Sequence, residues 1–371
     1  MTTIDIVIPV HSASRPISRA VRSVLADDAS GVTAVVVCHN IHVDVVRAQL
    51  GALADHPAVR FESLSDETRS PAAPRNYAIA RSAADYVGTL DSDDEFQPGA
   101  ITAWSAELVH RPDVVVGQMH FDGSGRHLAP VPRVRSFDQL DVVQDLLNYR
   151  TTLLGTLVRT EILRGDACPG YAEDYRTGED IAIGLFVWNS ARSLRYVTAR
   201  PGYFVHNDAT DRVTGETYSA AQVFAPVRAA VQVPAISTLG RRKRQAIAVK
   251  LMRRHVLDFL IAQLRAGRSI SEFLPEAAAT LNELLQFAPG SRGFFQRREA
   301  QAVDAIRAED AAGFERAMRA IDAASFRSKL IPANPLRTFA AEAFLMRGRR
   351  SRALTELLDE EAGDSSAGSA A

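Results

Sequence analysis

The amino-acid sequence predicts an α/β fold, in which helices cover a sheet, followed by an α-helical appendage. Over the first hundred residues, short apolar runs rich in β-branched residues alternate with segments of helical periodicity. This alternation is typical of a parallel sheet between helices. Beyond about residue 220 the apolar runs stop, and long Ala-, Leu-, Arg- and Glu-rich segments carry apolar residues at helical spacing.

Each element can be placed from its pattern. Strands are expected where a run is apolar almost throughout, because such a run suits burial on both faces of a sheet. Helices are expected where apolar residues recur three and four positions apart. The expected strands are 4–10, 33–38, 59–64, 85–91, 113–119 and 154–159, with a last strand pair within 194–206. The expected helices are 17–25, 43–54, 71–83, 99–110, 137–149 and 180–191.

These patterns divide the 371 residues into three parts. Residues 1–219 form the α/β domain and residues 220–358 the α-helical C-terminal domain. Residues 359–371 are small and polar, and we expect this tail to be disordered because it offers little apolar surface to bury.

Charge and cysteine content exclude several classes of protein. With 43 basic and 44 acidic residues the net charge is -1, whereas proteins that bind nucleic acid carry a basic excess, so we expect no nucleic-acid partner. Two cysteines are too few for a disulfide framework or a four-cysteine zinc site. The N-terminus does not resemble a signal peptide, and no stretch of about 18 apolar residues occurs. We therefore expect a cytoplasmic location.

Polar residues follow several of the expected strands, and ligands of open α/β sheets bind beyond the carboxyl ends of the strands. The cluster Asp91-Ser92-Asp93-Asp94 is the strongest feature, because its carboxylates repel one another unless a cation compensates. Mg²⁺ or Mn²⁺, held by carboxylates and substrate phosphates, is the usual solution. The alternative is an acidic turn that caps the next helix.

Two further segments carry charges suited to chemistry. Arg75 lies near the start of an expected helix, where a fixed positive charge suits phosphate oxygens, unless it forms an ordinary surface salt bridge. Glu179 and Asp180 precede an apolar helix, and a carboxylate placed there suits a general base. An ordinary helix cap is the alternative for Asp180. Glu173 and Asp174 compete for the base role without an apolar helix directly behind them.

Taken in order, these segments resemble the family 2 glycosyltransferases of the GT-A fold, which is a Rossmann-like mixed sheet flanked by helices. The resemblance rests on four motifs and covers residues 4 to about 216. The motifs are IVIPVH at the first strand, AAPRNYAIARSAADYVGTLDSDD, LLGTLVRTEIL, and GEDIAI about ninety residues after the acid cluster.

The resemblance implies a hexosyltransferase that moves a sugar, with inversion, from a nucleotide-diphosphate donor to an acceptor hydroxyl. It implies Asp180 as the base with Glu179 beside it, and Asp93 as the ligand of Mg²⁺ or Mn²⁺, with His206 as a second metal contact. The segment 206–215 could act as a lid. The donor-binding residues implied are Pro9, Val10, His11, His39, Asn40, Arg75, Asp91, Ser92 and Asp93.

One departure from the family pattern concerns the donor base. The family commonly places two acids after the second strand, where this chain has Cys38 and His39, followed by Asn40. Asn40 or backbone groups could replace part of that recognition, and UDP is the first expectation by family frequency alone. The acceptor is expected to be a carbohydrate or polymer of cell-wall or surface polysaccharide synthesis.

Other interpretations stay open. A nucleotidyltransferase would also use carboxylate-bound metal, although the loop HSASRP lacks the glycines and lysine of a phosphate-binding loop. A catalytically silent binding module would use its helical domain for a partner. The basic run 241–244 could meet an anionic polymer or the inner face of a membrane, or pack within the protein, which we favour. A homodimer is a further option.

Overall fold

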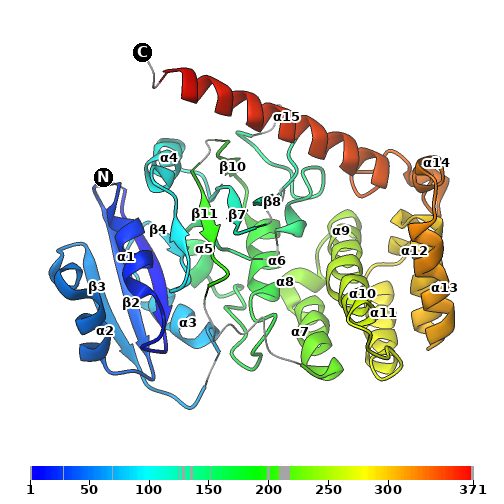
Figure 1. Ribbon diagram of the computed structural model, residues 1–371, viewed down its shortest axis with the longest axis horizontal. Coiled ribbons are helices and arrows are strands. Elements are labelled where there is room, and N and C mark those ends of the chain that lie inside the picture. The colour runs from blue at the N-terminus through cyan, green and yellow to red at the C-terminus, as the bar shows by residue number, and fades with distance from the viewer. Residues whose placement is uncertain are drawn as a thin grey trace.

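The computed structural model contains a seven-stranded sheet, a smaller sheet at its carboxyl edge, and a layer of helices beside them (Figure 1). It describes residues 2–27, 29–68, 70–123, 125–127, 130–133, 137–150, 152–198, 201–208 and 218–368. We call residues 2–208 the α/β part and residues 218–368 the helical part.

The main sheet has the strand order β10-β6-β9-β4-β1-β2-β3. Its strands pair in parallel, except that β9 runs antiparallel to both of its neighbours. The sheet is therefore mixed, with the four earliest strands forming a parallel block. The strands are β1 (Ile4–Val10), β2 (Val32–His39), β3 (Val59–Leu64), β4 (Tyr86–Thr89), β6 (Val114–Val116), β9 (Thr156–Arg159) and β10 (Leu194–Tyr196).

Alternate residues of the strands enter two separate cores, as the twofold repeat of a strand requires. Ile6 and Ile8 pack with α1, α2 and α4 on one face. Val7 and Val35 pack with α3, α5 and α6 on the other. The helices are α1 (Ile17–Leu25), α2 (Val43–Leu50), α3 (Ala72–Arg81), α4 (Ala100–Glu107), α5 (Thr160–Arg164) and α6 (Ile181–Ser190).

A second sheet, in the order β5-β11-β7-β8, splits two of the expected elements. The expected strand 113–119 divides into β6 and β7, and the expected pair within 194–206 divides into β10 and β11, which pair with β6 and β7 rather than with each other. The break falls at Gly117, where the Trp104 ring leaves no room for a side chain. The strands are β5 (Glu95–Phe96), β7 (Met119–Phe121), β8 (Gly125–His127) and β11 (Tyr203–Val205).

The helix expected over 137–149 is wrong for the described part of that segment, which forms turns and one 3₁₀ turn at Leu147–Tyr149. Buried Asp145 accepts hydrogen bonds from the backbone N–H groups of Arg133 and Asp141. Asp141 in turn accepts from the N–H groups of Val143 and Gln144. These side-chain bonds occupy backbone donors that a helix would use.

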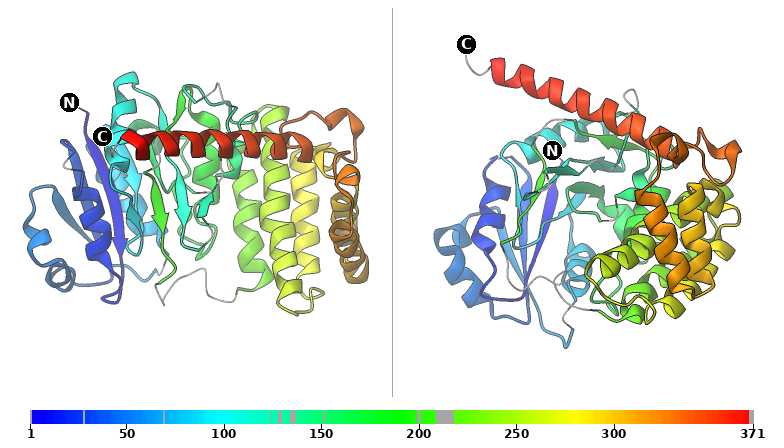
Figure 2. Two further views of the ribbon diagram at one scale, coloured as in Figure 1. Left: turned by 45° about the horizontal axis from the view of Figure 1, so that its top comes forward. Right: turned by 45° about the vertical axis from the view of Figure 1, so that its right-hand side comes forward.

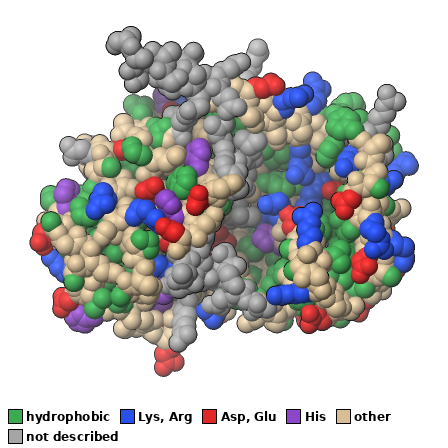
Figure 3. Space-filling view, viewed as in Figure 1, with side chains coloured by type: hydrophobic (Ala, Val, Ile, Leu, Met, Phe, Trp, Pro, Cys, Tyr) green, Lys and Arg blue, Asp and Glu red, His purple; other side chains and the backbone are tan. Residues whose placement is uncertain are grey.

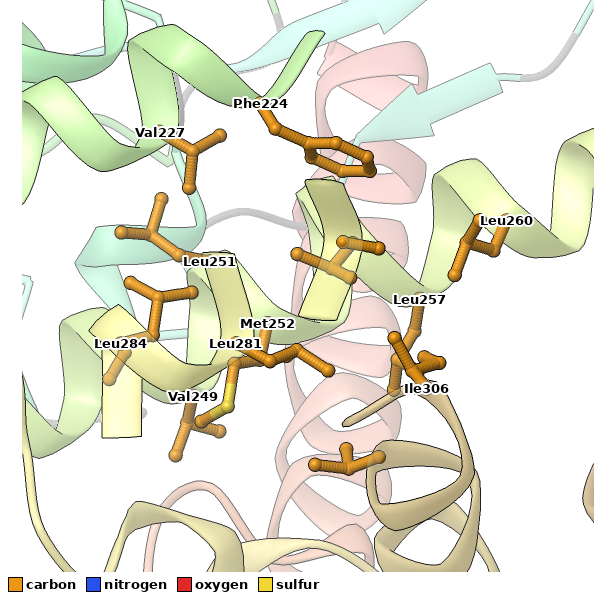
Figure 4. Close-up of a cluster of buried hydrophobic side chains, with 14 of the residues drawn as sticks. Phe224, Val227, Val249, Leu251, Met252, Leu257, Leu260, Leu281, Leu284 and Ile306 are labelled. Atoms are coloured by element: carbon orange, nitrogen blue, oxygen red, sulfur yellow. The ribbon is translucent and has the colours of Figure 1, made fainter. Parts of the chain in front are cut away.

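The helical part has its own apolar core, of which Figure 4 shows a portion. Helix α7 begins after Ser219, which forms a capping box with Gln222. Ile181 and Leu185 of α6 belong to this core, while Ile183 of the same helix belongs to the sheet core, so α6 lies in both. The elements are α7 (Ala220–Gln232), α8 (Pro234–Ser237), α9 (Arg241–Leu251), the π-helix Met252–Leu257, α10 (Asp258–Arg265), α11 (Leu274–Phe287), α12 (Arg297–Arg307), α13 (Ala311–Asp322), α14 (Phe326–Lys329) and α15 (Phe344–Gly368).

Helix α15 runs from the helical part back along the molecule toward the end where the N-terminus lies (Figure 2). Leu354 and Leu358 of this helix pack against Val131 and Leu146. The backbone is helical as far as Gly368, into the tail expected to be disordered, where Ala and Glu residues favour a helix. None of the described helices is both long and apolar enough to cross a membrane.

Candidate active site

Arg75 lies at the centre of the carboxyl edge of the sheet and connects two groups of acids. From the first turn of α3, its Nη2 donates to Asp91 Oδ1 at 2.5 Å and its Nη1 donates to Glu179 Oε1 at 3.1 Å. The guanidinium is buried and lies over the Tyr171 ring, 5.2 Å from the ring centre. Burial alone would lower the pKa of Arg75, but the charges of Asp91 and Glu179 raise it. Arg75 is therefore a fixed cation, not a surface salt bridge.

Asp180 stands at the start of α6, and its carboxylate makes no capping hydrogen bond to that helix. Burial raises the pKa of Asp180, while the charges of Arg75 and Lys250 and a hydrogen bond from Thr152 lower it. Burial and the neighbouring Asp180 charge raise the pKa of Glu179 to about 7. Gly178 has a φ of +74°, and a side chain there would meet Pro226 of α7, so this turn needs glycine. Glu179 and Asp180 are therefore held between the sheet and the helical part.

Residues Asp91 to Asp94, which follow β4, are called the acid loop below. Two arginines from the beginning of the chain contact this loop and compensate part of its negative charge. Arg15 Nη1 lies 2.7 Å from Asp93 Oδ2, with both side chains buried. Arg19, in α1, donates to the backbone oxygen of Asp93 and to both carboxylate oxygens of Asp208. The next helix is capped at Gly99, so the acid cluster is not its cap. Ser92 is also buried in this loop.

Asp94 ties the acid loop to β11. Its two carboxylate oxygens accept hydrogen bonds from the Tyr203 hydroxyl at 2.7 Å and from the His206 backbone N–H at 2.9 Å. Burial, followed by the charge of Asp91, raises the pKa of Asp94 to about 7. The His206 ring lies against Glu95, with 3.1 Å between Nε2 and Oε1. Of the expected lid 206–215, residues 209–215 lie outside the described part of the chain.

The acid loop offers oxygen ligands of the kind that Mg²⁺ and Mn²⁺ prefer. Asp93 is engaged by Arg15 and the His206 ring by Glu95. Within the described ranges, no group of three His, Cys, Asp or Glu side chains is arranged to hold a metal ion. A cation here would therefore take one or two carboxylates and complete its coordination with substrate phosphates and water, which is common for Mg²⁺.

A carboxylate missed by the sequence analysis lies where the donor base is expected. Asp66, after β3, accepts from His39 Nε2 at 2.8 Å, and its backbone N–H donates to Asn40 Oδ1 at 2.9 Å. Asn40 has a φ of 56°, which turns the chain at the end of β2. Burial would raise the pKa of Asp66, but hydrogen bonds from His39 and Thr68 lower it to about 2. Asp66 is thus an ionised acceptor despite the absence of acids after the second strand.

The end of β1 contributes less than expected. Val10 is fully buried in the sheet core, so its side chain faces away from the edge. Pro9 is partly buried and His11 is exposed beside it. Cys38 is buried in the same core, and burial raises the pKa of its thiol to about 11, as suits a strand-end residue that is not a nucleophile.

The face drawn in Figure 3 is hollowed between the α/β part and the helical part, with basic and histidine side chains inside the hollow. Lys250 of α9, which the sequence analysis did not single out, is buried, and its charge interacts with that of Asp180. Glu173 and Asp174 line a pocket of about 430 Å³ between the loop before α6 and helix α7. In the basic run 241–244, Lys243 and Arg244 donate to the backbone oxygens of Asn189 and Phe287, so these two pack within the protein.

Comparison with known families identifies the first part of the chain. The family model of glycosyl transferase family 2 matches residues 5–160, which contain β1 to β9, Arg75 and the acid loop. This part of the chain is therefore similar to the family 2 glycosyltransferases. The GT-A fold expected from that resemblance is confirmed by solved structures. The Staphylococcus aureus protein TarS, residues 1–349, has a TM-score of 0.69 at 15% identity, over 88% of this chain and 93% of that chain.

The names of two curated relatives refer to the synthesis or glycosylation of polymers. The succinoglycan biosynthesis protein ExoU of Rhizobium meliloti is 39% identical over 171 residues, or 44% of this chain and 46% of the relative. The poly(ribitol-phosphate) β-N-acetylglucosaminyltransferase TarP of Staphylococcus aureus is 21% identical over 233 residues, or 59% of this chain and 70% of the relative. The match to ExoU thus spans about half of that relative. A further structure of TarS 1–349 contains UDP-GlcNAc (TM-score 0.70, 15% identity, 87% of this chain and 92% of that chain).

Proposed function

We propose that this protein is an inverting glycosyltransferase of surface-polysaccharide synthesis that moves a sugar from a nucleotide-diphosphate donor, with UDP as the first candidate, to an acceptor hydroxyl. The observation that carries the proposal is the double contact of Arg75, which joins Asp91 on the acid loop to Glu179 beside Asp180. One buried cation thus lies between the two groups of acids that such a reaction needs on opposite sides of the sugar. The family 2 match and the UDP-GlcNAc complex of TarS support the donor class.

In the proposed reaction, Asp180 removes the proton from the acceptor hydroxyl as that oxygen attacks the anomeric carbon. The bond from the anomeric carbon to the donor phosphate breaks on the opposite side, which inverts the configuration. The leaving nucleoside diphosphate gains negative charge, and Arg75 offsets part of it because its guanidinium is fixed before the reaction. Asp66, which is held in place by His39 and Asn40, accepts a hydrogen bond from an N–H group of the donor base.

We also propose that a divalent cation binds with the donor, with Asp93 as its protein ligand. The cation would offset the charge that develops on the diphosphate. Arg15 is the guanidinium that now holds Asp93, so the same side chain is available to contact the diphosphate when Asp93 binds a cation. His206 remains a candidate metal contact from the neighbouring strand end.

The proposal is tested by thermal unfolding of the full chain with UDP, GDP, dTDP and CMP, each with and without Mn²⁺. A ligand at 100 times its Kd stabilises the native state by about 2.7 kcal/mol, which is readily measured. A metal-dependent increase in Tm with one nucleoside diphosphate supports the donor site and identifies its base. Transfer from the matching sugar nucleotide to an oligosaccharide acceptor then tests the reaction. No change with any nucleotide would contradict the proposal and favour the binding-module alternative.

A further inference from the structure

Lys250 is a buried cation of the helical part that the reaction proposed above does not use. It lies in α9 and is 1% exposed. Its Nζ is 3.0 Å from His255 Nε2. An ammonium group can only donate, so His255 accepts through Nε2 and is neutral. Burial and the charge of Lys250 hold the pKa of His255 well below its usual range, which agrees with that assignment.

The π-helix at residues 252–257 is what brings Lys250 and His255 together. In an α-helix, residues five apart point in directions that differ by about 140°, so their side chains do not meet. A π-helix bonds each residue to the fifth one along, and places such residues on one face. The π-helix Met252–Leu257 follows α9 directly and carries His255, and π-helical turns are frequent at functional sites.

Helix α9 lies beside α6, since Lys243 of α9 donates to the backbone oxygen of Asn189 in α6. The buried Lys250 of α9 interacts electrostatically with Asp180 at the start of α6. The two charges favour each other, since Lys250 lowers the pKa of Asp180 and Asp180 raises that of Lys250. The other groups that act on Asp180 are Arg75 from α3 and the Thr152 hydroxyl, both of which favour its ionised form. Glu179 is its acidic neighbour, and Tyr171 lies close enough for its own pKa to be raised by Asp180.

We propose that Lys250 is a positioning residue for the general base, through which the helical part supplies charge that keeps Asp180 ionised. The inference rests on the proposed function, because it assigns Lys250 a role in that reaction. A lysine whose chain neighbours Val249, Leu251 and Met252 all belong to the apolar core is costly to bury, and a methionine of similar length would be buried there at lower cost. We therefore attribute the presence of lysine at position 250 to its charge rather than to its packing.

The pH dependence of transfer follows from this arrangement. Burial is the main cause that lowers the pKa of Lys250, to about 7, so its charge is present below pH 7 and is lost above it. Below pH 7 the ammonium favours ionised Asp180, and transfer continues to lower pH than it would without Lys250. At alkaline pH Asp180 is ionised with or without that charge, and the effect of Lys250 disappears.

The test is kcat/KM for transfer between pH 5 and 9, in full-length wild type, K250M, K250R and K243M. A nearby opposite charge lowers a carboxyl pKa by about one unit or more. We expect the acid limb of K250M to move up by about one pH unit, with a loss of about tenfold at pH 5.5 and less than about twofold at pH 9. In K250R the acid limb of the kcat/KM profile should lie close to that of wild type. Lys243 is the matched control, because it is a lysine of α9 that contacts α6 at Asn189, near the end of α6 opposite to Asp180.

Several outcomes separate this inference from the proposed function. If wild type transfers no sugar from any donor, the proposed function fails. If wild type is active and K250M loses the same factor at every pH, Lys250 is only structural and the inference is overturned. A shift of the acid limb in K243M as large as in K250M would also overturn it, because helix docking would then be the cause. Thermal unfolding of K250M should show a Tm no lower than that of wild type.

Discussion

Arg15 and Asp93 form a buried ion pair that joins the loop after β1 to the acid loop after β4, with 2.7 Å between Nη1 and Oδ2. Asp93 is the carboxylate that the sequence motif singles out as a metal ligand. In the structure its charge is compensated by the Arg15 guanidinium. Removing one partner of a buried pair leaves the other charge without compensation. The pair therefore contributes to stability as well as to the proposed site.

The first prediction concerns that pair. R15M should lower the free energy of unfolding by about 3 kcal/mol, because it removes the buried ion pair with Asp93. Urea unfolding at pH 7.5 measures the change. R47M is the matched control, since Arg47 and Asp55 form an ion pair whose side chains are 41% and 79% exposed. It should cost less than about 1 kcal/mol. Equal losses in the two variants would show that burial does not set the strength of the Arg15 pair.

The second prediction concerns the base. D180N should reduce kcat by about 10³-fold or more, because the amide cannot take the acceptor proton, while the Kd for the nucleotide stays within about twofold. Steady-state kinetics and calorimetric titration measure the two effects. D174N serves as the control, since Asp174 lines the neighbouring pocket, and it should retain most of the wild-type rate. Normal turnover in D180N would remove Asp180 from the base role.

The third prediction concerns the cation. D93N should abolish the part of the UDP-induced increase in Tm that depends on Mn²⁺, and leave a smaller, metal-independent increase. D44N provides the comparison, because Asp44 is a carboxylate at the surface, 78% exposed. It should respond to Mn²⁺ and UDP as wild type does. An unchanged Mn²⁺ response in D93N would exclude Asp93 as the ligand.

The fourth prediction concerns the pH dependence of stability. The pKa of Glu179 is raised from 4.5 to about 7, mainly by burial and then by Asp180, so the folded protein binds its proton more tightly than the unfolded chain. This contribution to stability is complete below pH 4.5 and is lost as the pH rises to 7. In E179Q the decline of Tm between pH 4.5 and 7 should be shallower than in wild type. The same slope in both proteins would show that Glu179 does not titrate in this window.

The fifth prediction concerns recognition of the donor base. D66N should weaken UDP binding by about tenfold, or about 1.4 kcal/mol, because it removes the ionised acceptor beside His39. Calorimetric titration of UDP measures this loss. Binding of inorganic pyrophosphate, which has no base, should not change in the same variant. If binding of UDP and of pyrophosphate weakens by the same factor, Asp66 stabilises the loops around His39 and Asn40 rather than contacting the donor base.

Much of the α/β part is predictable, because each early strand is a continuous apolar run whose neighbours follow from the alternation of strands and helices. The wrong expectation at 137–149 has a local cause: the apolar spacing is helical, but Asp141 and Asp145 take the backbone donors. The division of the expected strand 113–119 depends on the tertiary contact between Gly117 and the Trp104 ring, which no local pattern contains.

The candidate site was predictable where a motif spans it. Arg75, Asp91 and Glu179 were expected along one edge, and the structure brings them together although Glu179 follows Arg75 by 104 residues. Arg15, Asp66 and Lys250 were missed, since each is a single polar residue in a segment without a distinctive spacing. The loop HSASRP could have suggested Arg15, because it follows a buried strand at the same edge.

Helix α6 contributes Ile183 to the core of the sheet and Ile181 and Leu185 to the core of the helical part. A protein truncated at residue 219 would expose those two side chains to water and should aggregate or lose the start of α6, where Asp180 stands. The same helix restricts exchange of domains between relatives. A helical part taken from a relative would have to match the side of α6 that carries Ile181 and Leu185 before it could pack there.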